Sequence, residues 1–217
     1  MNYYVTQILN SVILIPAIVS ILRYPHVASK IRPFIWYILF SALTEVVSFL
    51  VVISGYSNTL ISNMYVLLAY CLILYTYWRW DDQRSTRLYL SAGLLFLIVW
   101  IMEALFLSGI WSVMVYFRIC CSFVCVLFGV NLINVLMAKK APFRLWRGQF
   151  LLLMCLSLYL TVKVLVEIFY LYGLGNSRSF LINTFHIIIF VNVAVYIGYT
   201  FALLWIPRKR ESLLPLP

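Results

Sequence analysis

The chain has 217 residues, of which 65% are hydrophobic and only 10% are charged, and its mean hydropathy is +1.02. A soluble domain has roughly 45–50% apolar and about 25% charged residues. This composition therefore excludes a soluble enzyme, a disordered chain and a disulfide scaffold, because so much apolar surface must face lipid. The net charge of +10 does not indicate nucleic-acid binding, since the basic residues lie in short clusters between hydrophobic stretches.

Seven hydrophobic stretches are long enough to cross a bilayer as helices. In chain order they cover about residues 6–22, 34–54, 60–78, 88–107, 111–137, 149–172 and 180–206. The connections between them are short. The sequence thus predicts an all-α integral membrane protein with one seven-helix transmembrane domain over residues 1–207 and a short basic tail over residues 208–217.

The orientation of these helices follows from the distribution of basic residues. Thirteen of the sixteen lysines and arginines lie in the loops 23–33, 79–87 and 138–147 and in the tail. Cytoplasmic loops of membrane proteins carry the excess of lysine and arginine. We therefore expect the N-terminus outside and the C-terminus in the cytoplasm. The expected location is the cell membrane, either a plasma membrane or a bacterial inner membrane.

The second, fourth and sixth stretches each carry one glutamate, and two of these glutamates share a pattern. Glu103 and Glu167 each precede a glycine by six residues, Gly109 and Gly173, whereas Glu45 lies about one turn deeper. The pattern suggests one helix followed by three helical hairpins, and a chance match is the alternative.

Further polar residues are expected in the same outer half of the membrane as the glutamates. A charged side chain at the bilayer centre costs about 2.5–3.5 kcal/mol, so we expect this set to face the bundle. Lys163 and Glu167 are spaced to form an ion pair on one helix face, and at least one of them is expected to have a second partner across the bundle, with Glu103, Arg118 or His186 as the candidates. Two interpretations stay open, a network that fixes helix packing and a polar cavity that binds a ligand. The set is Glu45, Asn63, Glu103, Arg118, Lys163, Glu167, Asn183 and His186.

The sequence contains no catalytic motif, so we do not expect an enzyme, a cofactor or a metal site. The preferred hypothesis is a ligand-binding or sensory protein that acts through a membrane or cytoplasmic protein partner, with a small molecule or ion in the outer half. A small-solute, ion or proton transporter is the main alternative, although few glycines or prolines interrupt the helices. A non-catalytic subunit of a larger membrane complex is the third. Lipid is the expected surrounding, and nucleic acid is not an expected partner.

Overall fold

The computed structural model describes residues 9, 11–82, 86–138, 143–173 and 178–206, and for residues 143–147, 173 and 178–185 it describes the backbone alone. Every regular element in these ranges is helical. In chain order they are the 3₁₀ turn η1 (Ser11–Ile13), α2 (Leu14–Arg23), α3 (Arg32–Ile53), α4 (Thr59–Trp80), α5 (Thr86–Met102), the π turn η2 (Glu103–Leu107), α6 (Val115–Ala138), α7 (Phe143–Gly173) and α8 (Arg178–Trp205). The all-α membrane fold expected from the sequence is confirmed.

Six of these helices are long and apolar enough to cross a membrane, and they match the second to seventh predicted stretches. The first stretch is different. Its described part includes the short apolar helix Ser11–Arg23, and residues 6–8 and 10 of the predicted span lie outside the described residues.

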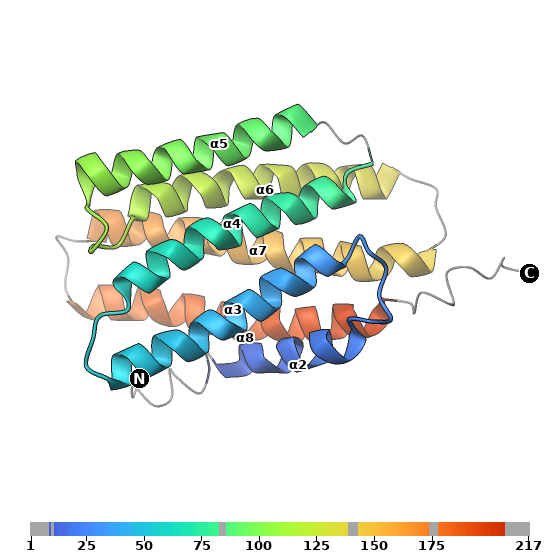
Figure 1. The fold of residues 1–217 in the computed structure, drawn as a ribbon, viewed down its shortest axis with the longest axis horizontal. Coiled ribbons are helices and arrows are strands. Elements are labelled where there is room, and N and C mark those ends of the chain that lie inside the picture. Colours follow the sequence, from blue (N-terminus) through green and yellow to red (C-terminus); the bar gives the residue numbers. More distant parts are fainter. Residues whose placement is uncertain (1–8, 10, 83–85, 139–142, 174–177, 207–217) are drawn as a thin grey trace, which may run out of the picture.

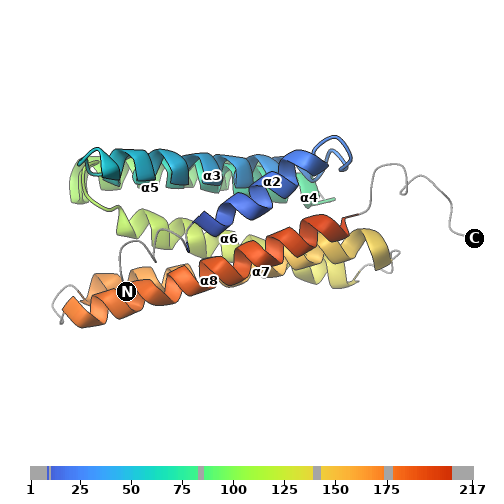
Figure 2. The same cartoon turned by 90° about the horizontal axis from the view of Figure 1, so that it is seen from below.

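The six long helices form two layers of three, α3–α4–α5 and α6–α7–α8 (Figures 1 and 2). Within the second layer α7 packs extensively on both α6 and α8, and both α4 and α5 contact α6 between the layers. The helix α2 joins the layers a second time by packing on α3 and α8. Consecutive helices run antiparallel as expected, and the pairs α3–α4, α5–α6 and α7–α8 are each in contact, although α5 and α6 belong to different layers.

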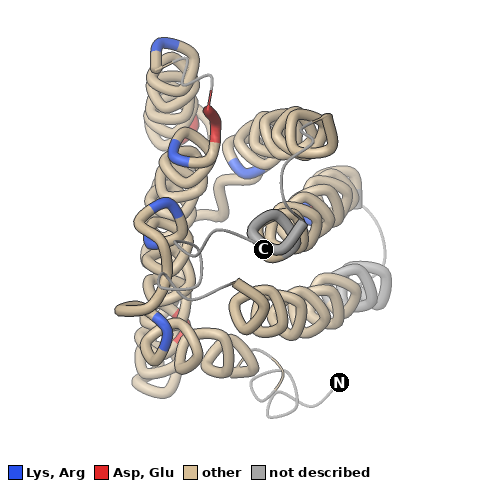
Figure 3. The backbone as a smooth tube through the Cα atoms, turned by 90° about the vertical axis from the view of Figure 1, so that its right-hand side faces the viewer, with Lys and Arg blue, Asp and Glu red and all other residues tan. Residues whose placement is uncertain are grey.

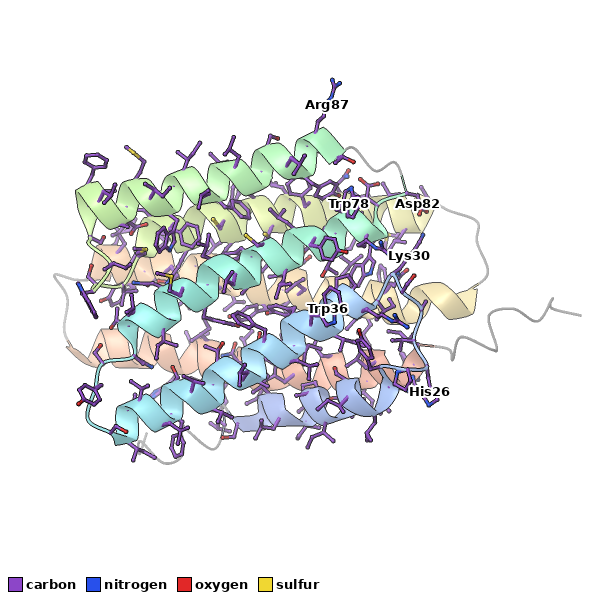
Figure 4. The ribbon with its side chains drawn as sticks, in the orientation of Figure 1. His26, Lys30, Trp36, Trp78, Asp82 and Arg87 are labelled. Carbon is purple, nitrogen blue, oxygen red and sulfur yellow. The ribbon has the colours of Figure 1, made fainter. Side chains whose placement is uncertain are left out.

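The ends of the helices that carry the basic clusters lie together at one end of the bundle (Figure 3). There Arg23 donates hydrogen bonds from Nη1 to the carbonyl oxygens of Leu203 at 2.6 Å and Ile206 at 2.7 Å, which satisfies the C-terminal turn of α8. Lys30 and Asp82 form an exposed ion pair at 3.0 Å, and both lie at this end in Figure 4. The basic tail lies outside the described residues, and the side of the membrane on which this end lies stays a prediction.

The opposite end of the bundle has two turns that need glycine. Gly55 follows α3 with φ of 82°, and Gly109 follows η2 with φ of 73°. A positive φ of this size is strained for residues with a Cβ atom. The turn at Gly109 brings η2, which carries Glu103, next to the start of α6, and this sets the geometry of the site described next.

Candidate functional site

The predicted polar residues lie mainly at the contact of α4 with α6 between the layers and at the contact of α6 with α7 within the second layer. Asn63 and Glu103 are each 1% exposed, and Glu167 and Lys163 are 7% and 8% exposed. These side chains face the protein interior rather than lipid. Their individual partners show what each one does.

Glu103 caps the N-terminus of α6. Its Oε1 accepts a hydrogen bond from the backbone N–H of Tyr116 at 3.2 Å, and its Oε2 accepts one from the N–H of Phe117. The hydroxyl of Ser108 donates to Oε1 at 3.3 Å. The first N–H groups of a helix have no partner within the helix, and the helix dipole favours negative charge there. The N–H groups at the start of α6 therefore satisfy the buried carboxylate of Glu103 and explain why it is buried.

Asn63 holds the turn that precedes α6. Its Nδ2 donates to the carbonyl oxygens of Ile110 at 3.0 Å and Ser112 at 2.7 Å. Its Oδ1 accepts a hydrogen bond from Nη2 of Arg118 at 3.3 Å. An amide has two donors and an acceptor, and here both kinds of atom have partners. Asn63 thus connects α4 to the turn and to the first residues of α6.

Arg118 and Glu167 form an ion pair that joins α6 to α7. Arg118 Nη1 lies 3.5 Å from Glu167 Oε1, and the two side chains are 13% and 9% exposed. Arg118 Nη2 also donates to the hydroxyl of Ser62 on α4 at 2.9 Å. Removing one member of a buried pair leaves the other charge uncompensated at a cost of about 3–5 kcal/mol. Three helices therefore meet at the guanidinium of Arg118.

Lys163 does not form the expected ion pair with Glu167. Its Nζ lies over the ring of Tyr70, 5.2 Å from the centroid, and over the ring of Tyr159 at 5.8 Å. Side chains in a helix point back towards its N-terminus, so the long chain of Lys163 runs towards Tyr159 and away from Glu167. Glu167 pairs with Arg118 instead. Among the described residues the ammonium group has no carboxylate partner, which corrects the pairing suggested by the i,i+4 spacing.

Tyrosines contribute more to this interior than the sequence indicated. The hydroxyl of Tyr70 donates to the carbonyl oxygen of Arg118 at 3.3 Å and shares a hydrogen bond with the hydroxyl of Ser122. Tyr65 donates to the hydroxyl of Ser41 on α3 at 2.9 Å. From the sequence the tyrosines of the third stretch are expected to serve as packing and interface residues. One feature of the sequence does indicate a contact between a tyrosine and a charge: Tyr159 and Lys163 are four residues apart and so lie on one helix face.

The remaining three predicted residues lie on α3 and α8. Glu45 is half-buried on α3, and its charge acts on the hydroxyls of Tyr65 and Tyr196. His186 is half-buried on α8 and forms no hydrogen bond or ion pair with the other described residues. Asn183 lies on α8, but its side chain is outside the described residues. The structure thus brings together Asn63, Arg118, Lys163 and Glu167, with Glu103 beside them.

Three charges dominate the centre of this cluster. Arg118 and Lys163 carry positive charge, and Glu167 is their neighbour of opposite sign. The carboxylate of Glu103 is already hydrogen-bonded to the N-terminus of α6. The centre therefore has two basic groups and one free acidic group to balance them, which is an excess of positive charge. Two cations there oppose metal binding, and among the described residues no group of three His, Cys, Asp or Glu is placed to hold a metal ion. The arrangement is suited to an anionic or hydrogen-bond-accepting group.

A cavity of about 640 Å³ lies elsewhere, between α4 and α5. Its walls are leucines and aromatic rings, including Leu68, Trp78 and Leu94, and none of the eight predicted site residues lines it. Much of the wall is exposed apolar surface of the kind that faces lipid. We therefore separate this cavity from the polar cluster.

Comparison of the chain with protein-family models, with curated proteins and with solved structures finds no match.

Proposed function

We propose that this chain is a receptor-like protein of the cell membrane, which binds a small ligand with an anionic group in the outer half, between the two layers. Binding would be passed on to a membrane or cytoplasmic partner protein. The observation that carries the proposal is Lys163, a buried ammonium group whose neighbours are the faces of two tyrosine rings.

Lys163 is the charge in this cluster for which folding provides the weakest explanation. A lysine at the centre of a membrane helix costs about 2.5–3.5 kcal/mol. Contact with an aromatic face returns about 0.5–2 kcal/mol, and both contacts here, at 5.2 and 5.8 Å, lie near the limit of about 6 Å for this interaction. Two such contacts reduce the cost, but a methionine of similar length would fill the same space with no charge to desolvate. Charged residues kept inside membranes at such cost commonly mark binding sites.

The surroundings of Lys163 also indicate the kind of ligand. An anionic group would pair with the ammonium, and Arg118 provides a second cation close by. The rings of Tyr70 and Tyr159 would pack against an apolar or aromatic part of the ligand. A small carboxylate with an apolar body satisfies both requirements.

The test uses the full chain in lipid nanodiscs with benzoate and octanoate, and with benzamide and octanamide as uncharged controls. We expect at least one carboxylate to raise the melting temperature more than its amide does. Lys163→Met should abolish this difference while leaving the melting temperature of the ligand-free protein unchanged or higher. Lys30→Met is the matched control, because Lys30 is exposed at the other end of the bundle and pairs with Asp82.

Two results would contradict the proposal. A large fall in the melting temperature of ligand-free Lys163→Met would make Lys163 a structural residue. Equal shifts with each carboxylate and its amide, unchanged by Lys163→Met, would show that the ammonium does not select the anionic group.

A transporter is the second candidate function. It is supported by buried hydroxyl groups that continue the polar interior towards the basic end of the bundle, among them Tyr77 and Ser157. Proteoliposomes loaded with a pH-sensitive dye, with and without benzoate outside, separate the two functions. Flux that depends on the protein supports transport, whereas binding without flux supports a receptor.

A further inference from the structure

A second group of buried polar side chains lies nearer the basic end of the bundle, away from the cluster around Lys163. Tyr77 on α4 is fully buried, and Ser157 on α7 is 8% exposed. Neither the hydroxyl of Tyr77 nor that of Ser157 has a hydrogen-bond partner among the described residues. Two orphan hydroxyls from different layers therefore share one region of the interior.

Gly129 on α6 shows how close these hydroxyls come to each other. A Cβ atom placed on Gly129 would lie 2.6 Å from Ser157 Oγ and 3.0 Å from the hydroxyl oxygen of Tyr77. Both oxygens are therefore within 3.0 Å of one point beside the glycine. They do not bond to each other directly. The two oxygens are therefore no more than 5.6 Å apart, the sum of these two distances, and a single water molecule can span such a separation with a hydrogen bond to each.

The membrane makes this arrangement costly unless something satisfies the hydroxyls. An unsatisfied polar group costs free energy inside any protein, and lipid chains provide no hydrogen-bond partner. A buried water typically makes about three hydrogen bonds to groups that otherwise lack partners. The hydroxyl of Tyr199 on α8, 1% exposed, also lacks a partner, and Tyr199 and Tyr77 act on each other electrostatically.

We propose that the contact of α4, α6 and α7 beside Gly129 binds a water molecule, which the hydroxyls of Tyr77 and Ser157 hold between them. The absence of a side chain at Gly129 lets both hydroxyls approach α6. The water satisfies two groups that the protein leaves unpaired. It also places water in the contact between the layers, about two helical turns from the Tyr70–Ser122 hydrogen bond towards the basic end of the bundle. Tyr77 follows Tyr70 by seven positions on α4, and Gly129 follows Ser122 by seven positions on α6.

The first test is radiolytic footprinting of the wild-type full chain in nanodiscs prepared in H₂¹⁸O. Bound water is the source of hydroxyl radicals inside a protein, so Tyr77 should be oxidised several-fold faster than Phe96, a ring that is also fully buried, once each rate is divided by the intrinsic reactivity of that ring towards hydroxyl radical. Oxidation of Tyr77 at the rate of Phe96 would overturn the proposal. This measurement needs no variant and is independent of whether the cluster around Lys163 binds a ligand.

The second test uses the sign of the stability change in Tyr77→Phe and Ser157→Ala. If a water bridges the hydroxyls, each substitution lowers the melting temperature, and the double variant loses less than the two single losses combined. If the hydroxyls are dry and unpaired, each substitution raises the melting temperature and the effects add. The second pattern would overturn the proposal. Should a variant fail to fold, the footprinting comparison on the wild-type chain decides the question.

Discussion

Replacing Glu103 by leucine should lower the free energy of unfolding by about 2–8 kcal/mol. The substitution removes the acceptor of two backbone N–H groups, those of Tyr116 and Phe117. Each N–H left without a partner in an apolar interior costs about 1–3 kcal/mol, and loss of the charge at the start of α6 adds about 0.3–2 kcal/mol. Glu103→Gln keeps one carbonyl oxygen as an acceptor, so we expect a smaller loss of about 1–2 kcal/mol.

Two measurements on the same samples check this prediction. Reversible unfolding in mixed micelles gives the loss of stability for each variant. Hydrogen exchange then locates it, because the amides of Tyr116 and Phe117 should exchange faster in Glu103→Leu while those at the far end of α6 do not change. Leu105→Ala is the control, since Leu105 lies in the same π turn and is 72% exposed.

The reasoning would be refuted by a Glu103→Leu variant as stable as the wild type. It would also be refuted if Glu103→Gln and Glu103→Leu were equally destabilised, because the retained acceptor would then contribute nothing. Faster exchange spread over all of α6 would point to a general packing defect rather than a lost cap.

Three further predictions concern the other charges. Glu167→Leu should cost about 3–5 kcal/mol in the same unfolding assay, and combining it with Arg118→Met should recover most of the loss, because a buried pair is removed together. Arg23→Met should cost about 1–3 kcal/mol and speed amide exchange at the end of α8, where its guanidinium satisfies carbonyl groups. Single cysteines introduced by Asn2→Cys and Lys140→Cys in a cysteine-free background should label from opposite sides of the membrane, and labelling from one side would refute the assigned topology.

The long helices could be predicted from the sequence because membrane spans depend on local composition. The expected stretches 34–54 and 60–78 became Arg32–Ile53 and Thr59–Trp80, with ends shifted by two residues or fewer. The start of α6 is less accurate, since the predicted span begins at residue 111 and the helix begins at Val115. Trp111 and Val113 are apolar, so hydropathy includes them, whereas Asn63 holds this part of the chain as a turn.

The partners of the polar residues could not be predicted in the same way. Spacing along one helix reveals neighbours on that helix, which is why Lys163 and Glu167 were expected to pair. The actual partners come from other helices. Arg118 on α6, which pairs with Glu167, was among the candidates expected across the bundle, whereas Tyr70 on α4, which covers Lys163, was not. The equal spacing from Glu103 to Gly109 and from Glu167 to Gly173 does not give the two glutamates the same role, because Glu103 caps a helix and Glu167 forms an ion pair. Equal spacing places two residues at equal depth but does not determine what packs against them.

If the chain is a receptor as proposed, the location of Lys163 suggests how the effect of a bound ligand would reach the cytoplasmic side. The ring of Tyr70 that covers the ammonium belongs to α4, and the hydroxyl of the same residue bonds to Arg118 and Ser122 on α6. One side chain therefore belongs both to the surroundings of Lys163 and to the contact between the layers. An anionic group that draws the ammonium away from Tyr70 would change this contact at its polar centre. Because α4 is a continuous helix from Thr59 to Trp80, a small rotation at Tyr70 would move Tyr77 and the basic end as well. Coupling between the ligand and the partner protein would then depend on the hydroxyl of Tyr70. The variant Tyr70→Phe should weaken this coupling, while its ring still covers Lys163.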